Sequence, residues 1–456
     1  MDINLFRIEK GNPDIVRESQ RRRGASVQLV DIVIALDADW RKLRFELDQL
    51  NKEAKALSVS ISQKKKENVD AALEVEKSKH LKVAISQLEQ TIKERLKQRD
   101  EKLNSVGNLV HQSVPVSLDE ANNEVVRMWG TPREKQDDLI HHHHLLHMID
   151  GYEPEVGVEV AGHRGYYLKG WGILLNQALI NYGLQFLSSK GYTPVQTPFF
   201  MRKSVMSKVA ALAEFDDSLY KVSGNENEEE MYLIATSEQP CCAIHMNSSI
   251  NPKSLPIKYV GYSTCFRKEA GAHGRDVWGI FRVHQFEKIE QFVLCPPDKS
   301  WDMHEEMISV SEEFYQSLGF AYRVVNIVSG ELNNAAAKKY DLEAWFPTFG
   351  EYRELVSCSN CTDYQSRRLD IKYGNQKTED GLTPFVHMLN STLTATERTI
   401  CCLLENYQTE KGIRIPTVLQ PYLAPFTKKL EDPTLIPFVK PLPKGAKGAK
   451  GAQKKK

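Results

Sequence analysis

At 456 residues the chain is long enough for about two or three domains with sizeable hydrophobic cores. Its formal charge sums to zero, but the last sixteen residues carry six lysines and no acidic residue. Eight cysteines without an extracellular spacing pattern favour a reducing compartment. No apolar run approaches the roughly 18 residues of a membrane span, and the charged N-terminus lacks the apolar core of a secretion signal. We therefore predict a soluble, cytoplasmic protein with no membrane partner.

The N-terminal region predicts two long helices that share an apolar seam. From Leu29 to Ile61 the apolar residues recur in steps of four and three, which is the repeat of a coiled coil. Three lysines and residues 68–70 interrupt the repeat, and it returns less regularly between Leu81 and Val106. A short break between two seams indicates an antiparallel helical hairpin, whose first helix would be roughly 55 Å long.

This helical arm has two candidate roles. A long helical hairpin usually serves as a spacer or a dimerisation element, and the seam alone favours such a role. Residues 1–106 nevertheless hold 22 Lys and Arg against 18 Asp and Glu. Clusters at Lys64–Lys66 near the tip and Arg21–Arg23 near the base are dense enough to contact phosphate groups. Nucleic-acid binding therefore stays open beside the structural roles.

Residues 110–150 are predicted to connect the arm to a larger domain. They contain prolines, an acidic patch and the run His141–His144. Clustered histidines can hold a metal, but these lie between apolar pairs and have no cysteine nearby. We interpret them as ordinary linker residues. At the other end of the chain, residues 444–456 are low in complexity and basic, and we predict that they are disordered.

The larger domain opens with a predicted helix and a predicted strand, each followed by residues typical of a turn or a helix start. Leu174–Ser189 has helical apolar spacing, and a glycine stop, a strand and Pro198 follow it, as expected of a helix–strand turn. Further on, an apolar strand from Met231 ends in Thr236-Ser237-Glu238. Taken alone, that ending is an ordinary helix start, because Thr and Ser are good N-caps.

The most informative stretch is a predicted β-hairpin with strand-like runs at 259–266 and 280–292, joined by a polar, glycine-bearing loop. Alternation places Arg267 and Glu269 on one face. Arginine suits phosphate oxygens, whereas a carboxylate suits an ammonium group or an exocyclic amine. A lone pair of this kind is more often a weak surface ion pair, so these two residues by themselves do not identify a site.

Two later strings also place polar residues at predicted strand ends. Glu354 to Ser357 precedes Cys358-Ser359-Asn360-Cys361, and a single CxxC is a weak sign of redox or zinc chemistry because no second pair is nearby. Residues 386–389 read as a strand and a helix begins near Thr394. Asn390, Ser391 and Thr392 lie at that junction, with Arg398 one turn into the helix.

Together these strings resemble the signature motifs of the class II aminoacyl-tRNA synthetases. Phe-Arg-x-Glu at 266–269, followed by Phe-Arg-Val-His-Gln-Phe-Glu-Lys-Ile-Glu-Gln-Phe at 281–292, is similar to the second motif in its seryl form. The helix–strand unit at 174–198 resembles the first motif, and 386–407 resembles the third, although Thr394-Ala395-Thr396 stand where glycines often occur. Over essentially its whole length the chain resembles the cytosolic eukaryotic seryl-tRNA synthetases.

The resemblance implies an α+β fold with a central antiparallel sheet flanked by helices and an N-terminal antiparallel helical-hairpin (coiled-coil) arm. It divides the chain into a tRNA-binding domain with the arm (1–112), a linker (113–150), a catalytic domain (151–443) and the disordered lysine-rich tail (444–456). In this family the arm lies against the long variable arm of the tRNA, and the first motif forms the interface of a homodimer.

The implied reaction is the ligation of L-serine to tRNA(Ser), and to tRNA(Sec) where one is present, in two steps. The serine carboxylate attacks the α-phosphorus of ATP, giving seryl-adenylate and pyrophosphate, and a terminal ribose hydroxyl of the tRNA then takes the seryl group. ATP is thus a substrate, and Mg²⁺ is the implied metal. Neither step needs a protein nucleophile, so positioning and charge stabilisation carry the catalysis.

The resemblance also assigns residues. Arg267 contacts the α-phosphate, Glu269 the adenine amine and Arg398 the γ-phosphate side, while Mg²⁺ is held by Glu354 and Ser357. Serine contacts are Thr236, Ser237, Glu238, Glu290, Asn390 and Thr392, of which Thr236, Glu238 and Glu290 hold the ammonium, and Asn390 and Thr392 read the hydroxyl. ATP contacts are Arg267, Lys268, Glu269, Arg282, Val283, Glu354, Leu355, Val356, Ser357 and Arg398.

Two alternatives come from other classes of protein. A catalytically inactive, synthetase-like RNA-binding or regulatory protein would need losses among the charged motif residues, and none is lost: the sequence keeps Arg267, Glu269, Glu290 and Arg398. A coiled-coil scaffold would not explain the long region of mixed α and β pattern that follows the arm.

Overall fold

The protein is described here by a computed structural model, which covers residues 1–210, 218–224, 229–269, 278–375, 377, 383–443 and 446. The chain forms two compact units, Met1–Leu109 and Val110–Lys456. The sequence places the first boundary at residue 112. The predicted lysine-rich tail lies outside the described residues apart from Ala446.

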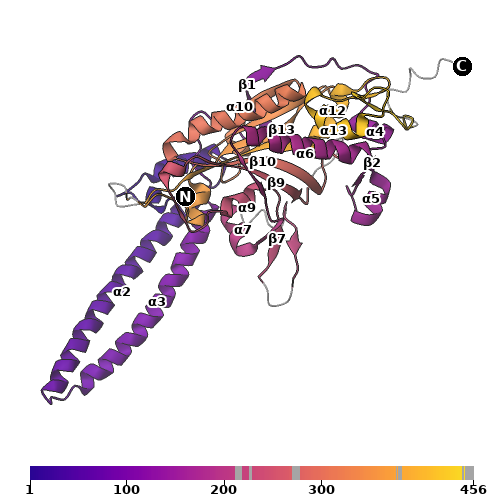
Figure 1. The fold of residues 1–456 in the computed structure, drawn as a ribbon. Helices are drawn as coiled ribbons and strands as arrows, with labels where there is room; N and C mark the ends of the chain where they lie inside the picture. The colour runs from indigo at the N-terminus through magenta and orange to yellow at the C-terminus, as the bar shows by residue number, and fades with distance from the viewer. Residues whose placement is uncertain are drawn as a thin grey trace. The chain divides into compact units, whose positions relative to one another are not determined.

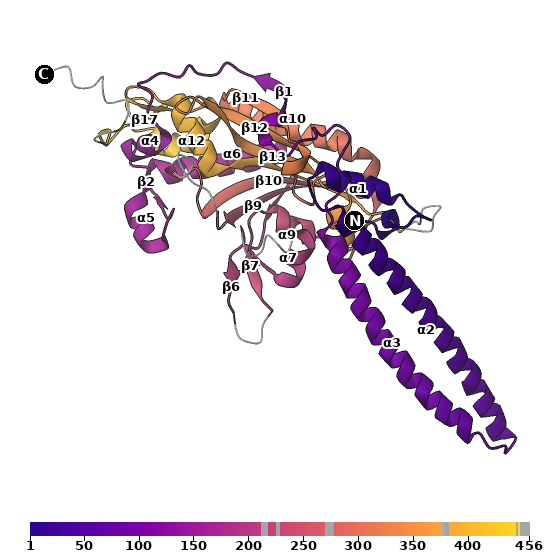
Figure 2. The ribbon, with the colours of Figure 1, turned by 180° about the vertical axis from the view of Figure 1, so that it is seen from behind.

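The first unit is built on two long helices, as the seam predicts. α2 (Gln28–Lys66) and α3 (Ala72–Ser105) run side by side in opposite directions (Figures 1 and 2). The 39 residues of α2 correspond to about 58 Å. The chain reverses within 67–71, where Asn68 adopts a left-handed conformation with φ +56°. The short elements η1 (Ile3–Phe6) and α1 (Pro13–Arg22) precede the pair. The predicted antiparallel helical hairpin is confirmed.

A buried carboxylate ties three parts of this unit together. Asp37 is 1% exposed and is one of the buried residues of α2. Both of its oxygens accept hydrogen bonds of 2.8 Å from Arg7, Arg99 lies 3.2 Å away and Arg41 3.1 Å away. The Arg99 guanidinium also stacks 5.0 Å from the centre of the Trp40 ring. Asp37 therefore joins the N-terminal segment to α2 and α3.

The second unit is organised around one sheet of eight strands, ordered β1-β11-β12-β13-β15-β10-β9-β4. All neighbours pair antiparallel except β4 and β9, which pair parallel. The strands are β1 (Glu124–Trp129), β4 (Thr193–Gln196), β9 (Ile257–Phe266), β10 (Gln285–Cys295), β11 (Tyr322–Asn326), β12 (Lys338–Phe346), β13 (Glu351–Asn360) and β15 (His387–Ala395).

Helices and small sheets surround this sheet (Figure 1). The helices are α4 (His142–Met148), α5 (Pro154–Ala161), α6 (Trp171–Ser189), α7 (Lys203–Val209), α9 (Glu238–Ala243), α10 (Ser300–Leu318), α11 (Tyr364–Leu369), α12 (Thr396–Tyr407) and α13 (Gln420–Thr427). The small sheets pair β2 (Tyr152–Glu153) with β3 (Tyr167–Leu168), β7 (Met231–Leu233) with β5 (Phe200–Arg202) and β6 (Lys221–Val222), β8 (Ser249–Ile250) with β14 (Lys372–Tyr373), and β16 (Gly412–Arg414) with β17 (Leu435–Pro437).

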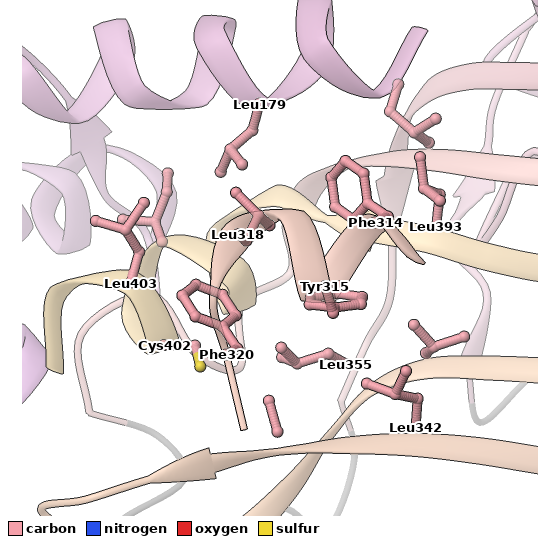
Figure 3. Close-up of a cluster of buried hydrophobic side chains, with 14 of the residues drawn as sticks. Leu179, Phe314, Tyr315, Leu318, Phe320, Leu342, Leu355, Leu393, Cys402 and Leu403 are labelled. Carbon is pink, nitrogen blue, oxygen red and sulfur yellow. The ribbon is translucent and has the colours of Figure 1, made fainter. Parts of the chain in front are cut away.

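The alternation of β10 separates the two faces of the sheet. Ile289 and Val293 join the large core that α6, α10 and α12 cover, whereas Phe292 and Leu294 join a smaller cluster on the other face. Figure 3 shows part of the large core, where Leu179 of α6 lies near residues of α10 and of the strands. The predicted antiparallel sheet flanked by helices is therefore confirmed.

The structure differs from the sequence interpretation at the segments between motifs. The expected linker 113–150 supplies the edge strand β1 and the helix α4 to the second unit. The second strand of the hairpin begins at Gln285 instead of residue 280, and β15 extends through Asn390 and Thr392 to Ala395. Among the described helices, none is both long and apolar enough for a membrane span.

We predict that Asp37→Ala lowers the local free energy of unfolding of α2 and α3 by about 3–5 kcal/mol. The reason is that the change leaves three arginines close together without their shared carboxylate. Native-state hydrogen exchange of the α2 and α3 amides measures this, and Asp39→Ala, an exposed change on the same helix, should stay within about 0.5 kcal/mol. Equal exchange in the two variants would contradict the role of Asp37.

The pH dependence of this contribution follows from the pKa of Asp37. Burial by itself raises that pKa, but the Arg7 hydrogen bond and the charges of Arg7, Arg99 and Arg41 outweigh it and hold the pKa below 3.8. A lowered pKa in the folded state means that the stabilisation is complete above the unfolded-state value and is lost as the pH falls through the folded-state value.

Candidate active site

A cavity of about 390 Å³ lies on the sheet face opposite the large core. Its floor comes from β10, β13 and β15, and its walls come from the ends of the hairpin and from α9, α11 and α12. Predicted site residues that line it are Thr236, Glu238, Arg267, Glu269, Arg282, Val283, Glu290, Glu354, Leu355, Ser357, Asn390, Thr392 and Arg398. The structure therefore brings together motifs that are far apart in the sequence.

Two β-bulges aim the strand residues into this cavity. In a regular strand Glu354 and Ser357 would point to opposite faces, because side chains alternate. The pairing of β12 with β13 shifts register at Leu355, so that Leu355 and Val356 both pack into the core while Glu354 and Ser357 both face the cavity. The bulge re-aims a carboxylate and a hydroxyl onto one face.

A second bulge acts in the same way on β15. Its pairing with β10 shifts register at Leu393, and Leu393 lies in the core. The next residue, Thr394, forms a side-chain hydrogen bond of 2.8 Å with Thr399 of α12. Thr392 and Ala395, on either side of these two, both line the cavity. The helix α12 then begins at the cavity wall, which places Arg398 at its third position over the floor.

Three guanidinium groups define one end of the cavity, which we call the arginine end: Arg267, Arg282 and Arg398. Arg267 donates to the Ala235 carbonyl at 3.3 Å and stacks 5.2 Å from the centre of the Phe286 ring. Arg282 lies 3.6 Å from Glu269. Arg267 is thus held by a backbone oxygen and a ring, whereas Arg282 lies beside a carboxylate.

Arg398 shapes the same end through contacts with two residues, Phe281 and Glu354. Its Nε donates to the Phe281 carbonyl at 3.3 Å, and the guanidinium lies 5.0 Å from the centre of the Phe281 ring. Its Nη1 is 3.5 Å from a carboxylate oxygen of Glu354. Burial by itself raises the pKa of Glu354, but Arg398, Lys339 and the other arginines of this end hold it below the usual 4.5. Glu354 therefore stays ionised at neutral pH.

The opposite end, which we call the acid end, contains Glu238, Glu290 and Thr392. Glu290 is 1% exposed, lies 2.6 Å from the ammonium of Lys288 and accepts a hydrogen bond of 3.2 Å from Thr392. Glu238 accepts from Gln365 of α11 at 2.8 Å. The end therefore holds two carboxylates, of which Glu290 already has a cation beside it.

Three predicted residues do not line the cavity among the described residues. Ser237 is fully buried, and its hydroxyl donates to the Gly261 carbonyl at 3.4 Å. Val356 lies in the core because of the bulge. Lys268 follows the end of β9, and its backbone N–H donates to the Ser218 carbonyl at 3.1 Å. For these three the structure does not support the predicted contacts.

Sequence reasoning missed Lys288 and Gln365. Lys288 stands two residues before Glu290, so the alternation of a strand was the signal that both share the cavity face. Gln365 carried no local signal, because α11 approaches α9 only in the folded unit. The histidine run, which we interpret as linker residues, places His142 in a buried pair with Glu405.

The donor set for a divalent cation is present at the arginine end. Glu354 and Ser357 supply the carboxylate and hydroxyl oxygens that Mg²⁺ prefers. On the neighbouring strand, Asp341 pairs with Ser357, is 6% exposed, and its Oδ1 is buried without a hydrogen-bond partner among the described residues. Burial, with the charge of Glu354 adding to it, raises the pKa of Asp341 to about 7. These residues fit a cation.

Comparison with known proteins extends these observations. Residues 1–110 match the family described as "Seryl-tRNA synthetase N-terminal domain". Residues 220–407 match "tRNA synthetase class II core domain (G, H, P, S and T)". The first match covers the helical unit, and the second covers most of the residues that line the cavity.

Whole-chain relatives agree with the family matches. The chain is 56% identical to the cytoplasmic serine–tRNA ligase of Dictyostelium discoideum, over 97% of this chain and 96% of the relative. It is 48% identical to the cytoplasmic serine–tRNA ligase of Naegleria fowleri, solved in complex with AMP, with a TM-score of 0.86 and coverage of 96% and 99%.

A second solved structure is the seryl-tRNA synthetase of Pyrococcus horikoshii complexed with ATP. It is 40% identical, has a TM-score of 0.85 and covers 93% of this chain and 98% of its own. The names of the Dictyostelium and Naegleria enzymes confirm the predicted cytoplasmic location. The helical arm, the class II sheet and identity across nearly the whole length lead to one conclusion: the chain belongs to the seryl-tRNA synthetases, the serine–tRNA ligases of class II.

Proposed function

We propose that this cavity joins L-serine to ATP, giving seryl-adenylate and pyrophosphate, and then passes the seryl group to the 3′ end of tRNA(Ser). The observation that carries the proposal is a single cavity with three arginines at one end and two carboxylates with a threonine at the other. A phosphate chain suits the first end, and an amino acid with a hydroxyl suits the second. The alternative of an inactive relative finds no support, because Arg267, Glu269, Glu290 and Arg398 all line the cavity.

At the arginine end we assign ATP. Arg267 contacts the α-phosphate, because its hydrogen bond to the Ala235 carbonyl places it close to Thr236 of the acid end. Arg398 contacts the γ-phosphate side, and Glu269 accepts a hydrogen bond from the adenine amine. Arg282, Val283 and Leu355 complete the wall. Guanidinium groups that are already held in place stabilise charge that develops on phosphate oxygens without reorganising.

Mg²⁺ bound by Glu354 and Ser357 would neutralise phosphate charge at the arginine end. Their oxygens share one face because of the bulge at Leu355. Oxygen ligands of this kind are the ones that the ion prefers. Asp341 pairs with Ser357 across the strands and lies beside them.

At the acid end we assign serine. We assign its ammonium to Glu238 with the hydroxyl of Thr236, because Lys288 already neutralises Glu290. Glu290, Thr392 and Asn390 then form the wall that pairs with the serine hydroxyl. This modifies the sequence-based assignment of Glu290 to the ammonium. The serine carboxylate would point to the arginine end, where in-line attack on the α-phosphorus needs only positioning.

The helical arm is the proposed contact for the tRNA. At its tip Lys65 and Lys66 are exposed, while Lys64 pairs with Glu74. At its base Arg23 is only 8% exposed and donates to the Asn108 carbonyl at 3.0 Å, which removes it from the predicted basic cluster. The exposed lysines at the tip therefore offer the better phosphate contact.

A homodimer is the proposed assembly. Large apolar side chains are exposed on α5, β3 and the start of α6: Val156, Val158, Val160, Tyr167 and Ile173. A concentration of exposed apolar residues marks a surface that a partner covers. The predicted first motif, which forms the dimer interface in this family, includes α6. We therefore propose that a second copy of the chain covers this surface.

We predict that Arg267→Ala lowers serine-dependent ATP–pyrophosphate exchange by about 10²–10³-fold. A donor aimed at a phosphate oxygen in the transition state is lost, and losses of that size follow removal of one such donor. Lys268→Ala is the matched control, since the neighbouring side chain lies outside the cavity lining, and it should keep near-normal exchange. A folded Arg267→Ala variant with full exchange activity would refute the assignment.

For serine selection we predict that Thr392→Val weakens serine activation at least about tenfold more than alanine activation. Valine keeps the shape of threonine but leaves Glu290 and the serine hydroxyl without one partner. Exchange rates with both amino acids give the ratio. Thr264→Val, on β9 outside the cavity lining, serves as the control. An equal loss for both amino acids would show that Thr392 does not read the hydroxyl.

For the arm we predict that removing residues 50–85 spares serine activation but lowers tRNA charging by about a hundredfold or more. This cut keeps Asp37 and Arg99 at the base and removes only the outer part of the helical pair. Loss of the exposed lysines removes phosphate contacts. Exchange and charging assays on one preparation separate the steps, and Lys65→Glu with Lys66→Glu in the intact arm should give a smaller loss. Full charging by the shortened chain would assign the arm another role.

A further inference from the structure

His142, the first residue of α4, is completely buried and does not line the cavity. Its Nδ1 is 2.8 Å from Oε1 of Glu405, and its Nε2 is 3.1 Å from the carbonyl oxygen of Trp278. Carboxylate and carbonyl oxygens only accept hydrogen bonds, so both ring nitrogens donate, which requires the imidazolium form. Burial by itself lowers the pKa of His142, but Cys401 and Glu405 outweigh it and raise the pKa well above 6.5.

Glu405 is positioned to balance this buried charge. It is 0% exposed, and its second oxygen accepts from the backbone N–H of Thr348 at 3.2 Å. Glu405 lies near the end of α12, the same helix that carries Arg398 near its start. His142 therefore connects α12 to the backbone of the hairpin at Trp278.

Trp278 leads directly into the part of the hairpin that lines the arginine end. Gly279, with φ +61°, packs so closely that an added Cβ would lie 3.1 Å from Cδ2 of His142. Two residues later, the Phe281 carbonyl accepts a hydrogen bond from Arg398, and the Phe281 ring lies against the Arg398 guanidinium. These contacts connect Arg398 to itself by two routes. The helix α12 links Arg398 to Glu405, and His142 links Glu405 to Trp278. The chain from Trp278 to Phe281 then returns to Arg398.

We propose that His142 is a positioning residue for ATP: through its two hydrogen bonds it fixes the Phe281–Val283 segment relative to Arg398 without touching either substrate. The proposal rests on the assignment of the arginine end to ATP. It gives a function to one member of the histidine run. The two hydrogen bonds of His142 have different roles in this proposal. The bond to Trp278 sets the geometry of the site, and the bond to Glu405 compensates a buried charge.

Two amide substitutions test the bonds one at a time. In His142→Asn the amide nitrogen takes the place of Nδ1 and keeps the bond to Glu405, whereas in His142→Gln it takes the place of Nε2 and keeps the bond to Trp278. We expect the dissociation constant of ATP with Mg²⁺, measured by calorimetry, to rise about tenfold in His142→Asn and less than about threefold in His142→Gln. The KM for serine in pyrophosphate exchange should not change in either.

Stability provides the second measurement. Both variants should melt at lower temperature, because each leaves a buried group without its partner. Adding Glu405→Gln to His142→Gln removes the unpaired carboxylate, so it should restore much of the melting temperature while ATP affinity stays close to that of the unchanged chain. His147→Asn, a change on the same helix, is the control for α4.

The outcomes are distinct. Equal weakening of ATP binding in His142→Asn and His142→Gln, or a parallel rise in the KM for serine, would show a general structural role and overturn the proposal. Unchanged ATP binding in both would overturn it as well. Absence of serine-dependent exchange in the unchanged chain would refute the proposed function instead, and calorimetry with ATP would still decide the role of His142.

Discussion

The two-residue period of the β-strand is the constraint on which this site depends. A strand that faces a core on one side and a cavity on the other can offer only every second residue to the cavity. The site nevertheless uses Glu354 with Ser357, and Thr392 with Ala395, each pair three positions apart. The bulges solve this by turning two successive residues toward the core. Core packing at Leu355 and Leu393 therefore decides which polar groups face the cavity.

The charges of the cavity divide because each carboxylate has a different neighbour. Glu354 lies among arginines, and its pKa is held low by them. Glu290 is buried against Lys288 and Thr392, so its charge is balanced by the Lys288 ammonium within the low-dielectric floor of the cavity. Glu238 has the neutral Gln365 beside it. Under the proposed assignment, this arrangement places the phosphate chain and the serine ammonium at opposite ends and needs no catalytic nucleophile.

Local pattern predicted the elements well where one pattern dominates. The four-and-three repeat gave α2 and α3, and the apolar spacing at 174–189 gave α6, because in both the buried face follows from the chain alone. Within 113–150 the strand β1 was not predicted, because it is an edge strand that is exposed on both faces and shows no alternation. The bulges and the partners Gln365 and Glu405 arise from pairing between distant segments, which no local window contains.

Charge pairs with a buried carboxylate join several segments of this chain that are distant in sequence. Asp37 joins the N-terminal segment to α2 and α3, His142 joins α4 to α12, and Arg127 of β1 joins Glu312 of α10 at 2.7 Å. Such pairs lose much of their attraction to desolvation, so apolar residues of the same shape would stabilise the fold equally well. Two segments joined by an apolar contact can, however, shift relative to each other, whereas a carboxylate that bonds to two fixed donors holds the segments in one relative position. The pair between His142 and Glu405 shows why this matters, because a shift there would move Phe281 away from Arg398. Charge pairing in this protein thus serves the alignment of its parts more than their stability.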